Sequence, residues 1–382
     1  MGITTSNICR RSNSMKILYV TTISNTMTFF IEHIKMLLNE GHSVELACSS
    51  ALKPVNPIYN ELGCKIHEIP FSRSPFSKNN IAAYKKLKRL VESEGYDIVH
   101  CHTPNAAMIT RLACRKVRKQ GTKVFYTAHG FHFFKGAPLK NWLMFYPVEK
   151  ICARWTDVLI TINHEDYEFA KKNMPAKKVC HVPGVGLNLD KFRNVKCDRN
   201  ETRSLLGMPL DCFLLLSVGE LNANKNHQTV IRAMACMKQK NVHYMIAGVG
   251  CLKENLHRLA VNLGIGEKVH FLGYRNDIPD LAYASDVFCF MSRREGLGMA
   301  ALEAMACGLP LISSNVHGIN DYSENGVTGY KCAPCDVNKV CEYLDVLSEN
   351  SELKKKIGEG NKRIVERFSS DNVVAEMRRL YE

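Results

Sequence analysis

The sequence predicts an α/β protein built from two doubly wound, Rossmann-like domains. Short apolar segments rich in β-branched residues alternate with helical patterns along most of the chain, as is typical of parallel sheets covered by helices on both faces. The chain has 382 residues, of which 46% are hydrophobic, so it is long enough to form two domain cores. A cluster of glycine and proline around residue 184 follows the last strand of the first half and marks the boundary between the halves.

Each half has its own series of expected strands, with helices between most of them. Two of the expected helices span Met27–Asn39 and Asn105–Lys119. Ligands of open α/β sheets bind outside the carboxyl ends of the strands, so two such domains facing each other would form a ligand cleft. The expected strands are Lys16–Thr22, Ser43–Cys48, Lys65–Ile69, Ile98–His102, Lys123–Thr127, Val158–Ile162 and Val179–Val182 in the first half, and Phe213–Val218, His243–Ala247, Val269–Leu272, Val287–Met291 and Leu309–Ser313 in the second.

The expected domain boundaries follow from these two series. Residues 1–14 are polar and unpatterned, and we expect a disordered leader or a misplaced start codon there. The first domain is expected over residues 15–184 and the second over residues 201–360, with a linker at residues 185–200. Residues 361–382 form a terminal, mostly helical segment.

Positive charge is concentrated in the first half. The whole chain has a formal net charge of +14, and residues 15–184 alone contain 24 Lys and Arg against 13 Asp and Glu. Two basic runs, Lys85–Arg89 and Arg115–Lys119, lie in helical contexts. Solvated helix faces explain such runs most simply, and docking on an anionic membrane or on a phosphate-bearing acceptor is the alternative. Nucleic acid fits less well, because no recognised binding module accompanies the charge.

The cysteine pattern indicates reduced thiols. The 16 cysteines are scattered, many lie in apolar runs, and no secretory apolar segment precedes them, so we expect a cytoplasmic protein. Cys332 and Cys335 have C-x-x-C spacing without a second pair, which favours loop cysteines over a zinc or redox site. No run of about 18 apolar residues occurs, so no membrane-spanning helix is expected.

The most informative stretch for function is Ser285–Gly308. An apolar strand ends there in a loop, and Gly296 and Gly298 precede a helix with apolar residues at helical spacing. The N–H groups at the start of a helix are unpaired and carry partial positive charge, and glycine lets a ligand approach the backbone near Leu297 and Met299. The stretch is therefore suited to phosphate or sugar oxygens.

Two carboxylates, Glu295 and Glu303, frame this helix start. The segment E-G-L-G-M-A-A-L-E-A-M-A-C-G resembles the E-x7-E signature of retaining glycosyltransferases of family 4, which have the GT-B fold of two Rossmann-like domains facing a cleft. The resemblance implies that Glu295 contacts the donor sugar and that Glu303 binds the ribose hydroxyls of the nucleotide. It also implies that the terminal segment crosses back to the first domain. An ordinary helix with an exposed glutamate is the alternative.

The other strand ends of the second half match the family in part. The family pattern V-G-R-L-x-x-x-K-G uses its arginine and lysine to bind the donor diphosphate. This chain has Gly219 and Lys225 at matching positions but Glu220 in place of the arginine, so Lys225 is the candidate and Arg293 or Arg294 would supply the second cation. A solvated lysine at a helix start is the alternative for Lys225. The turn containing Gly248 and Gly250 resembles the A-G-x-G turn of the family.

The strand ends of the first half supply candidates for acceptor binding. Ser24 and Asn25 follow the first strand, where GT-B enzymes often have a glycine-rich loop; this chain lacks those glycines, and helix capping is the alternative role. His102 ends the fourth strand and is a candidate for the cleft or for packing. We expect His100 and His102 to point to opposite faces of the strand, which argues against shared metal ligation.

The fifth strand is followed by T-A-H-G-F-H, in which His129 precedes a glycine. This histidine resembles the one that family members place beside the donor sugar. A metal site formed by His129 and His132 is the rival interpretation, and it lacks a third ligand at suitable spacing. Lys135 and the aromatic residues before it are candidates for the acceptor wall, where a lipid-linked diphosphate would require a cation.

Together these features predict a retaining hexosyl or N-acetylhexosaminyl transferase of the bacterial exopolysaccharide and capsule type. The expected donor is a nucleotide sugar, with a UDP-sugar favoured, and the expected acceptor is a saccharide or an undecaprenyl-diphosphate-linked saccharide. Peripheral contact with the inner face of the membrane is the alternative to a purely cytoplasmic protein, and neither nucleic acid nor a metal or other cofactor is expected. The alternatives are a GT-B sugar-nucleotide epimerase and a non-catalytic binding subunit. A dehydrogenase is disfavoured because no early G-x-G-x-x-G follows a strand.

Overall fold

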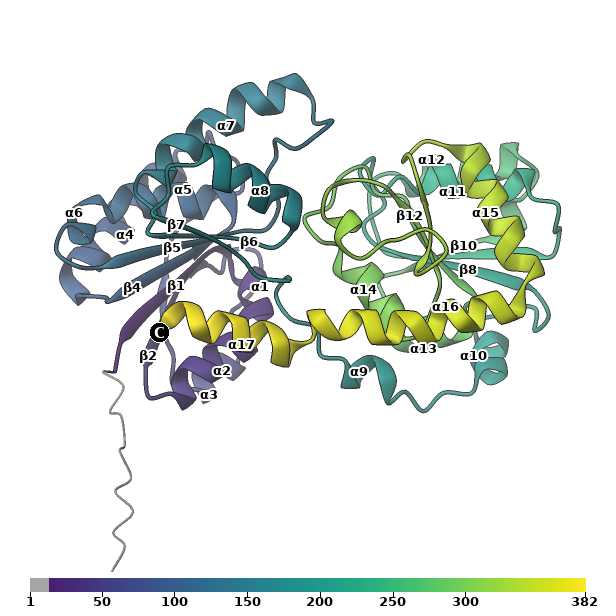
Figure 1. Ribbon diagram of the computed structural model, residues 1–382, viewed down its shortest axis with the longest axis horizontal. Helices are drawn as coiled ribbons and strands as arrows, with labels where there is room; N and C mark the ends of the chain where they lie inside the picture. Colours follow the sequence, from purple (N-terminus) through teal and green to yellow (C-terminus); the bar gives the residue numbers. More distant parts are fainter. Residues whose placement is uncertain (1–13) are drawn as a thin grey trace, which may run out of the picture. The chain divides into compact units, whose positions relative to one another are not determined.

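The computed structural model describes residues 14–382 and divides them into two compact units. Nearly all of the expected leader, residues 1–14, lies outside the described residues. The first unit contains the chain up to Thr161, residues Tyr167–Val182 and the C-terminal residues Val374–Glu382. The second contains Ile162–Asp166 and Pro183–Val373. Each unit is an α/β body with its own parallel sheet (Figure 1).

The first unit is built on a seven-stranded sheet with the order β3-β2-β1-β4-β5-β6-β7. All of its strand pairs are parallel, and the strand order reverses between β1 and β4, which is where a doubly wound sheet binds its ligands. The strands are β1 (Lys16–Ile23), β2 (Ser43–Ser49), β3 (Lys65–Glu68), β4 (Ile98–His102), β5 (Lys123–Ala128), β6 (Val158–Thr161) and β7 (Lys178–His181).

Helices connect these strands, as parallel pairing requires. The buried faces of β1, β4 and β5 pack with α4 and α5 in one apolar cluster. The helices are α1 (Ser24–Met27), the 3₁₀ turn η1 (Thr28–Phe30), α2 (Ile31–Asn39), α3 (Ile58–Glu61), α4 (Asn79–Glu94), α5 (Pro104–Ala113), α6 (Arg115–Arg118), α7 (Leu139–Ala153) and α8 (His164–Asn173), of which α8 begins in residues grouped with the second unit.

The second unit has a six-stranded parallel sheet with the order β10-β9-β8-β11-β12-β13. Its order reverses between β8 and β11, so the loops after these two strands meet at the ligand-binding edge. The strands are β8 (Phe213–Val218), β9 (Val242–Ala247), β10 (Val269–Gly273), β11 (Val287–Phe290), β12 (Leu311–Ser314) and β13 (Gly329–Cys332). The helices are α9 (Asp190–Arg193), α10 (Arg199–Leu205), α11 (His227–Cys236), α12 (Lys253–Asn262), α13 (Ile278–Ala284), α14 (Met299–Ala306), α15 (Val337–Glu349) and α16 (Ser351–Ile364), with 3₁₀ turns η2 (Gly266–Lys268), η3 (His317–Asp321) and η4 (Val365–Phe368).

The two sheets confirm the predicted fold, with three differences of detail. Twelve strands were expected and are present, and β13 was missed because G-Y-K-C is short and has only one strongly apolar position. The helix expected over Met27–Asn39 is divided into α1, η1 and α2. The helix expected over Asn105–Lys119 is divided at Cys114 into α5 and α6.

The C-terminal helix α17 (Ser370–Tyr381) ends in the core of the first unit. The hydroxyl of Tyr381 lies 2.6 Å from the hydroxyl of Tyr19 on β1 and 2.5 Å from Nδ1 of His100 on β4. All three side chains are buried, so these bonds fix the last residues of the chain to two central strands. Within residues 14–382, no helix has both the length and the hydrophobicity needed to cross a membrane.

Candidate active site

The loop between β11 and α14 has the geometry of an anion-binding helix start. Gly298 precedes the first residue of α14 with φ 91°, a left-handed conformation that favours glycine. A Cβ atom at this position would lie 2.6 Å from the ring of Phe290, so the site also requires the absence of a side chain. The side chain of Leu297 is buried in the core, whereas Met299 is half-buried. A ligand at this loop would therefore meet the backbone of Leu297, because its side chain points into the protein.

Lys225 and Glu295 meet in the second unit although they are far apart in sequence. Nζ of Lys225 donates a hydrogen bond of 2.6 Å to Oε1 of Glu295, and the two side chains are 20% and 14% exposed. The ammonium also lies 4.9 Å from the ring centroid of Phe290, within cation–π range. The backbone N–H of Lys225 donates to Oδ1 of Asn222, which fixes the loop after β8. These contacts place a cation and a carboxylate together at the carboxyl end of the sheet.

Glu303 is the fifth residue of α14 and is half-buried. Burial raises the pKa of its carboxyl group, and the nearby charge of Lys191 partly opposes this rise. Within the described residues, no hydrogen bond or ion pair engages the carboxylate. A half-buried acceptor of this kind is suited to ligand hydroxyl groups, which would satisfy its oxygens without a cation.

The loops after β8 and β9 pack so closely against each other that three of their positions require glycine. A Cβ atom on Gly248 would lie 1.9 Å from the carbonyl oxygen of Gly219, and one on Gly250 would lie 2.4 Å from the carbonyl oxygen of Leu221. A Cβ atom on Gly219 would lie 3.0 Å from the side chain of Lys225. These glycines therefore shape the loop that carries Lys225, a role that does not require them to touch a ligand.

The carbonyl group of Gly296 is held by residues that were not among the predicted site residues. Nδ2 of Asn163 donates to this carbonyl over 2.9 Å and also to Asp166 over 2.9 Å. Asp166 in turn lies 2.9 Å from Nε2 of the fully buried His317 side chain. His317 has φ 46°, an unusual conformation for a residue with a side chain, and such strain is concentrated at functional sites. No local sequence pattern indicates this network, because its members follow different strands.

The two remaining cation candidates have different surroundings. The guanidinium of Arg294 is largely buried; this desolvation lowers its pKa, and the negative charges of Asp166 and Glu295 oppose the shift. Arg293 is exposed. Glu220, which stands where the family has arginine, is also exposed.

His129 follows β5 in the first unit. Burial lowers the pKa of its imidazole to about 4, so the ring is neutral near pH 7. Its Nε2 lies 3.2 Å from Nδ1 of His102, and no hydrogen bond to a described residue engages its Nδ1. A neutral ring of this kind can exchange hydrogen bonds with a sugar hydroxyl through Nδ1.

The expectation that His100 and His102 point to opposite faces was wrong. Their ring centroids are 4.2 Å apart, because residues i and i+2 of a strand share a face. His102 is 1% exposed and stacks on Phe30 at 4.0 Å, so it lies in the core next to His129. At this position His102 can hold His129 in place, but it exposes too little surface to contact an acceptor directly. Burial lowers the pKa of both His100 and His102 well below its usual value.

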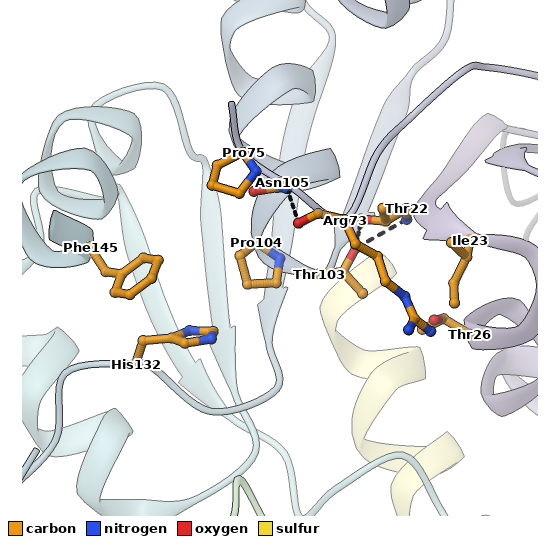
Figure 2. Close-up of a pocket in the computed structure, with 10 residues that line it drawn as sticks. All are labelled: Thr22, Ile23, Thr26, Arg73, Pro75, Thr103, Pro104, Asn105, His132 and Phe145. Carbon is orange, nitrogen blue, oxygen red and sulfur yellow. Dashed lines mark hydrogen bonds between the residues drawn. The ribbon is translucent and has the colours of Figure 1, made fainter. Parts of the chain in front are cut away.

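The other acceptor candidates of the first unit do not converge. Ser24 is buried, and its hydroxyl donates to the carbonyl oxygen of Lys53 over 2.6 Å. Asn25 and Lys135 are exposed. Instead, a cavity of about 320 Å³ opens beside β1 and β4, lined by other residues (Figure 2). Its polar lining comes from Thr22, Thr26, Arg73, Thr103, Asn105 and His132.

Comparisons with known proteins agree with this architecture. A family model described as "Glycosyl transferases group 1" matches residues 198–364, and one described as "Glycosyl transferase 4-like" matches residues 16–163. The putative glycosyltransferase EpsD of Bacillus subtilis (strain 168) is 38% identical over 371 residues, which cover 96% of each chain. The UDP-Gal:alpha-D-GlcNAc-diphosphoundecaprenol alpha-1,3-galactosyltransferase of Escherichia coli is 27% identical, with 94% of each chain covered.

Solved structures show the same fold. The crystal structure of Anabaena HepE in complex with UDP and glucose superposes with a TM-score of 0.79 at 18% sequence identity, covering 96% of this chain and 99% of HepE. The family assignment follows from three findings: the two parallel Rossmann-like sheets, the two matching family models and the relative at 38% identity. The chain belongs to the group 1, family-4-like glycosyltransferases of the bacterial exopolysaccharide and capsule type, and it has the GT-B fold.

Proposed function

We propose that this glycosyltransferase moves a hexose or N-acetylhexosamine, with retention of configuration, from a UDP-sugar to a lipid-linked or growing saccharide during bacterial surface polysaccharide synthesis. The observation that carries the proposal is the meeting of Lys225, Glu295 and the N-terminus of α14 at the carboxyl edge of the second sheet. The name of the E. coli relative, which specifies UDP-galactose and a diphosphoundecaprenol-linked acceptor, supports the donor and acceptor classes. The UDP complex of HepE supports the nucleotide.

The donor diphosphate would bind at the cationic part of this site. Lys225, Arg294 and the backbone N–H groups from Gly296 to Met299 supply positive charge or hydrogen-bond donors there. Negative charge develops on the diphosphate as it leaves, and preorganised donors stabilise such charge most effectively. The ammonium of Lys225 is paired with Glu295, so donor binding would redirect Lys225 to phosphate oxygens and release Glu295 toward the sugar.

The remaining roles complete the donor site. Glu295 would accept hydrogen bonds from sugar hydroxyls and Glu303 from the ribose hydroxyls, while neutral His129 would bind the sugar through Nδ1. Gly219, Gly248, Gly250 and Gly298 would shape the loops around the donor. Of the expected acceptor residues, Asn25 and Lys135 remain candidates for direct contact, and we assign Ser24 and His102 to support of the site.

The proposed reaction follows the same-face course that the family resemblance implies. The acceptor hydroxyl attacks the anomeric carbon on the face from which the diphosphate leaves, the bond to the diphosphate breaks, and a donor phosphate oxygen takes the acceptor proton. This course requires no protein nucleophile, and we propose that it uses neither a metal nor an organic cofactor. We further place the enzyme in the cytoplasm, with its basic first domain near the anionic inner face of the membrane.

The test is nucleotide release by purified protein from a panel of UDP-, GDP- and ADP-sugars, with and without short lipid-diphosphate saccharides. We expect release from one UDP-sugar that depends on the acceptor, and a product whose anomeric configuration by NMR matches that of the donor. An inverted product would contradict the retaining course. An epimerised nucleotide sugar formed without acceptor would indicate the epimerase, and tight nucleotide binding without turnover would indicate a binding subunit.

A further inference from the structure

Two neighbouring cavities in the first unit differ in the functional groups that line them. The cavity of about 320 Å³ shown in Figure 2, here called the Arg73 cavity, has a guanidinium and threonine hydroxyls in its wall, and it adjoins an apolar cavity of about 250 Å³. The two share lining residues from four segments of the chain, so they are continuous along one wall. The shared residues are Pro75, Pro104, Asn105, His132 and Phe145.

The Arg73 cavity offers an anion a cation and hydroxyl groups. Arg73 is exposed at its edge, and Figure 2 shows the guanidinium extending toward Thr26. No hydrogen bond or ion pair to another residue in 14–382 engages this guanidinium, and no carboxylate lines the cavity. Threonine hydroxyls complete the polar wall. A solvated cation beside hydroxyl groups, without a competing anion, is the arrangement that binds phosphate.

The position of Arg73 is fixed by the strand ends. Nδ2 of Asn105, at the start of α5, donates to the carbonyl oxygens of Ser72 over 3.0 Å and Arg73 over 2.7 Å. Thr103 has φ 64°, an outlying conformation for a β-branched residue, and its hydroxyl lies 2.7 Å from that of Thr22. The loop after β3 is thus attached to the ends of β1 and β4, at the point where the strand order reverses.

The apolar cavity is lined mainly by aromatic and aliphatic side chains. Phe131 and Phe133 stack with their centroids 4.8 Å apart, and Met108, Met144 and Val148 face the same space. The one carboxylate in its wall, Glu149, is paired with the buried Arg111 over 2.9 Å, so its charge is compensated. This lining suits a hydrocarbon and offers little to a sugar.

An exposed apolar surface extends from this cavity along α7. The side chain of Phe76 at the cavity mouth is 84% exposed, and on α7 the fractions are 73% for Leu139, 70% for Leu143 and 49% for Ile151. Lys140, Lys150 and Arg154 are exposed on or directly after the same helix, and its only carboxylate is the buried, paired Glu149. An exposed face that combines apolar and cationic residues matches the surface of an anionic membrane.

We propose that the two cavities together bind the lipid-phosphate part of the acceptor. The phosphate lies at Arg73, the first segment of the hydrocarbon chain fills the apolar cavity, and the rest of the chain passes over the exposed face of α7 into the bilayer. The apolar cavity is smaller than the about 300–1,000 Å³ of an ordinary ligand pocket, so it holds only the start of a long chain. This inference rests on the proposed lipid-linked acceptor, and it assigns residues of the first unit to that acceptor.

The test compares three soluble probes by calorimetry: farnesyl diphosphate, farnesol and inorganic diphosphate. We expect farnesyl diphosphate to bind at least tenfold more tightly than either of the others. Arg73→Gln should weaken binding of farnesyl diphosphate at least tenfold and leave farnesol unchanged, whereas the double variant Phe76→Ser/Val148→Ser should weaken farnesyl diphosphate and farnesol but not inorganic diphosphate. Both sites of substitution are on the surface, so folding should be retained.

Matched controls separate this site from others. Arg89→Gln on α4 and Phe29→Ser on η1 change an exposed cation and an exposed aromatic side chain outside both cavities, and they should leave all three affinities unchanged. Lys225→Gln reports any diphosphate that binds at the donor loop instead. Equal affinity for farnesyl diphosphate and inorganic diphosphate, or equal losses in the control variants, would overturn the inference.

Transfer assays distinguish failure of this inference from failure of the proposed function. Transfer by the wild-type protein to a free saccharide, together with no binding of farnesyl diphosphate to the wild-type protein, would retain the transferase and reject the lipid-phosphate site. If the probes bind as expected but the protein turns over no donor, the lipid-phosphate site would be retained and the proposed function rejected.

Discussion

The ammonium of Lys225 donates a 2.6 Å hydrogen bond to the carboxylate of Glu295, across 70 residues of sequence. A cation suited to phosphate and an acceptor suited to sugar hydroxyls therefore neutralise each other. Both side chains are partly shielded from water, and the pairing leaves neither charge uncompensated there. Donor binding would exchange this pair for two ligand contacts.

Replacing Glu295 with glutamine should impair transfer much more than folding. Glutamine has nearly the same shape and keeps one oxygen that can accept from Lys225, while it loses the charge that strengthens bonds to sugar hydroxyls. We expect kcat/KM to fall about 10- to 100-fold, equivalent to about 1.5–3 kcal/mol, with little change in the apparent Tm. Steady-state kinetics and a thermal melt provide the measurement. An unchanged rate with intact donor binding would contradict the assignment of Glu295.

Replacing Lys225 with glutamine should weaken nucleotide binding. The variant removes the cation that we assign to the diphosphate, so the Kd for UDP should rise about tenfold or more and depend less on salt. Lys356→Gln is the matched control, because Lys356 is exposed on α16, outside the donor loops. Calorimetric titration with UDP at two salt concentrations measures both effects. Equal UDP affinities of the two variants would contradict the assignment of Lys225 to the donor site.

Replacing Gly318 with alanine should disturb the donor loop through a steric contact. The new Cβ atom would lie 1.9 Å from the carbonyl oxygen of Gly296, so the loop must move. We expect weaker UDP binding and destabilisation of about 1–3 kcal/mol, as in other overpacked sites. Gly360→Ala in α16 is the control: its nearest contact is 3.8 Å away, and alanine favours the helix by about 1 kcal/mol. A Gly318→Ala protein with wild-type stability and UDP affinity would show that this contact relaxes freely.

Replacing His33 with leucine should reduce the loss of folding stability at acidic pH. His33 is 3% exposed, its two ring nitrogens have no hydrogen-bond partner in residues 14–382, and burial lowers its pKa to about 4. An unfolded histidine titrates near pH 6.5, so the unfolded state binds the proton first and stability falls as pH decreases from about 6.5 toward 4, by about 3 kcal/mol in total. Leucine does not bind a proton, so the variant lacks this part of the pH dependence.

Apparent Tm values from pH 7.5 to pH 4.5 measure this effect. The advantage of His33→Leu over the wild type should grow as the pH decreases, although His100, His102 and His129, whose pKa values burial also lowers, retain some acid sensitivity. His257→Leu on α12 replaces an exposed histidine and should follow the wild-type pH profile. Parallel profiles for His33→Leu and the wild type would indicate that His33 accepts a proton in the folded protein.

Particular residues show how far the sequence predicts this site. The positions of Lys225, Glu295 and Glu303 relative to their strands and helix follow from local hydrophobic periodicity and glycine placement, and they were predicted. Arg73 was not singled out, because its loop follows a short strand, and only the sheet order places that loop beside Thr22 and Asn105. The shared orientation of His100 and His102 was predictable from strand geometry, and the expectation there was mistaken.

The sequence by itself determined that the chain alternates strands and helices in two series, and which residues stand at the strand ends, because these features depend on neighbours within a few positions. Tertiary structure decided which strand ends meet. The order of strands in each sheet brings Lys225 to Glu295 and Asn105 to the loop of Arg73, whereas the packing of residues 162–166 within the second unit brings Asn163 to Gly296. These contacts join segments separated by 32 to 133 residues, so they depend on long-range packing that no local pattern encodes.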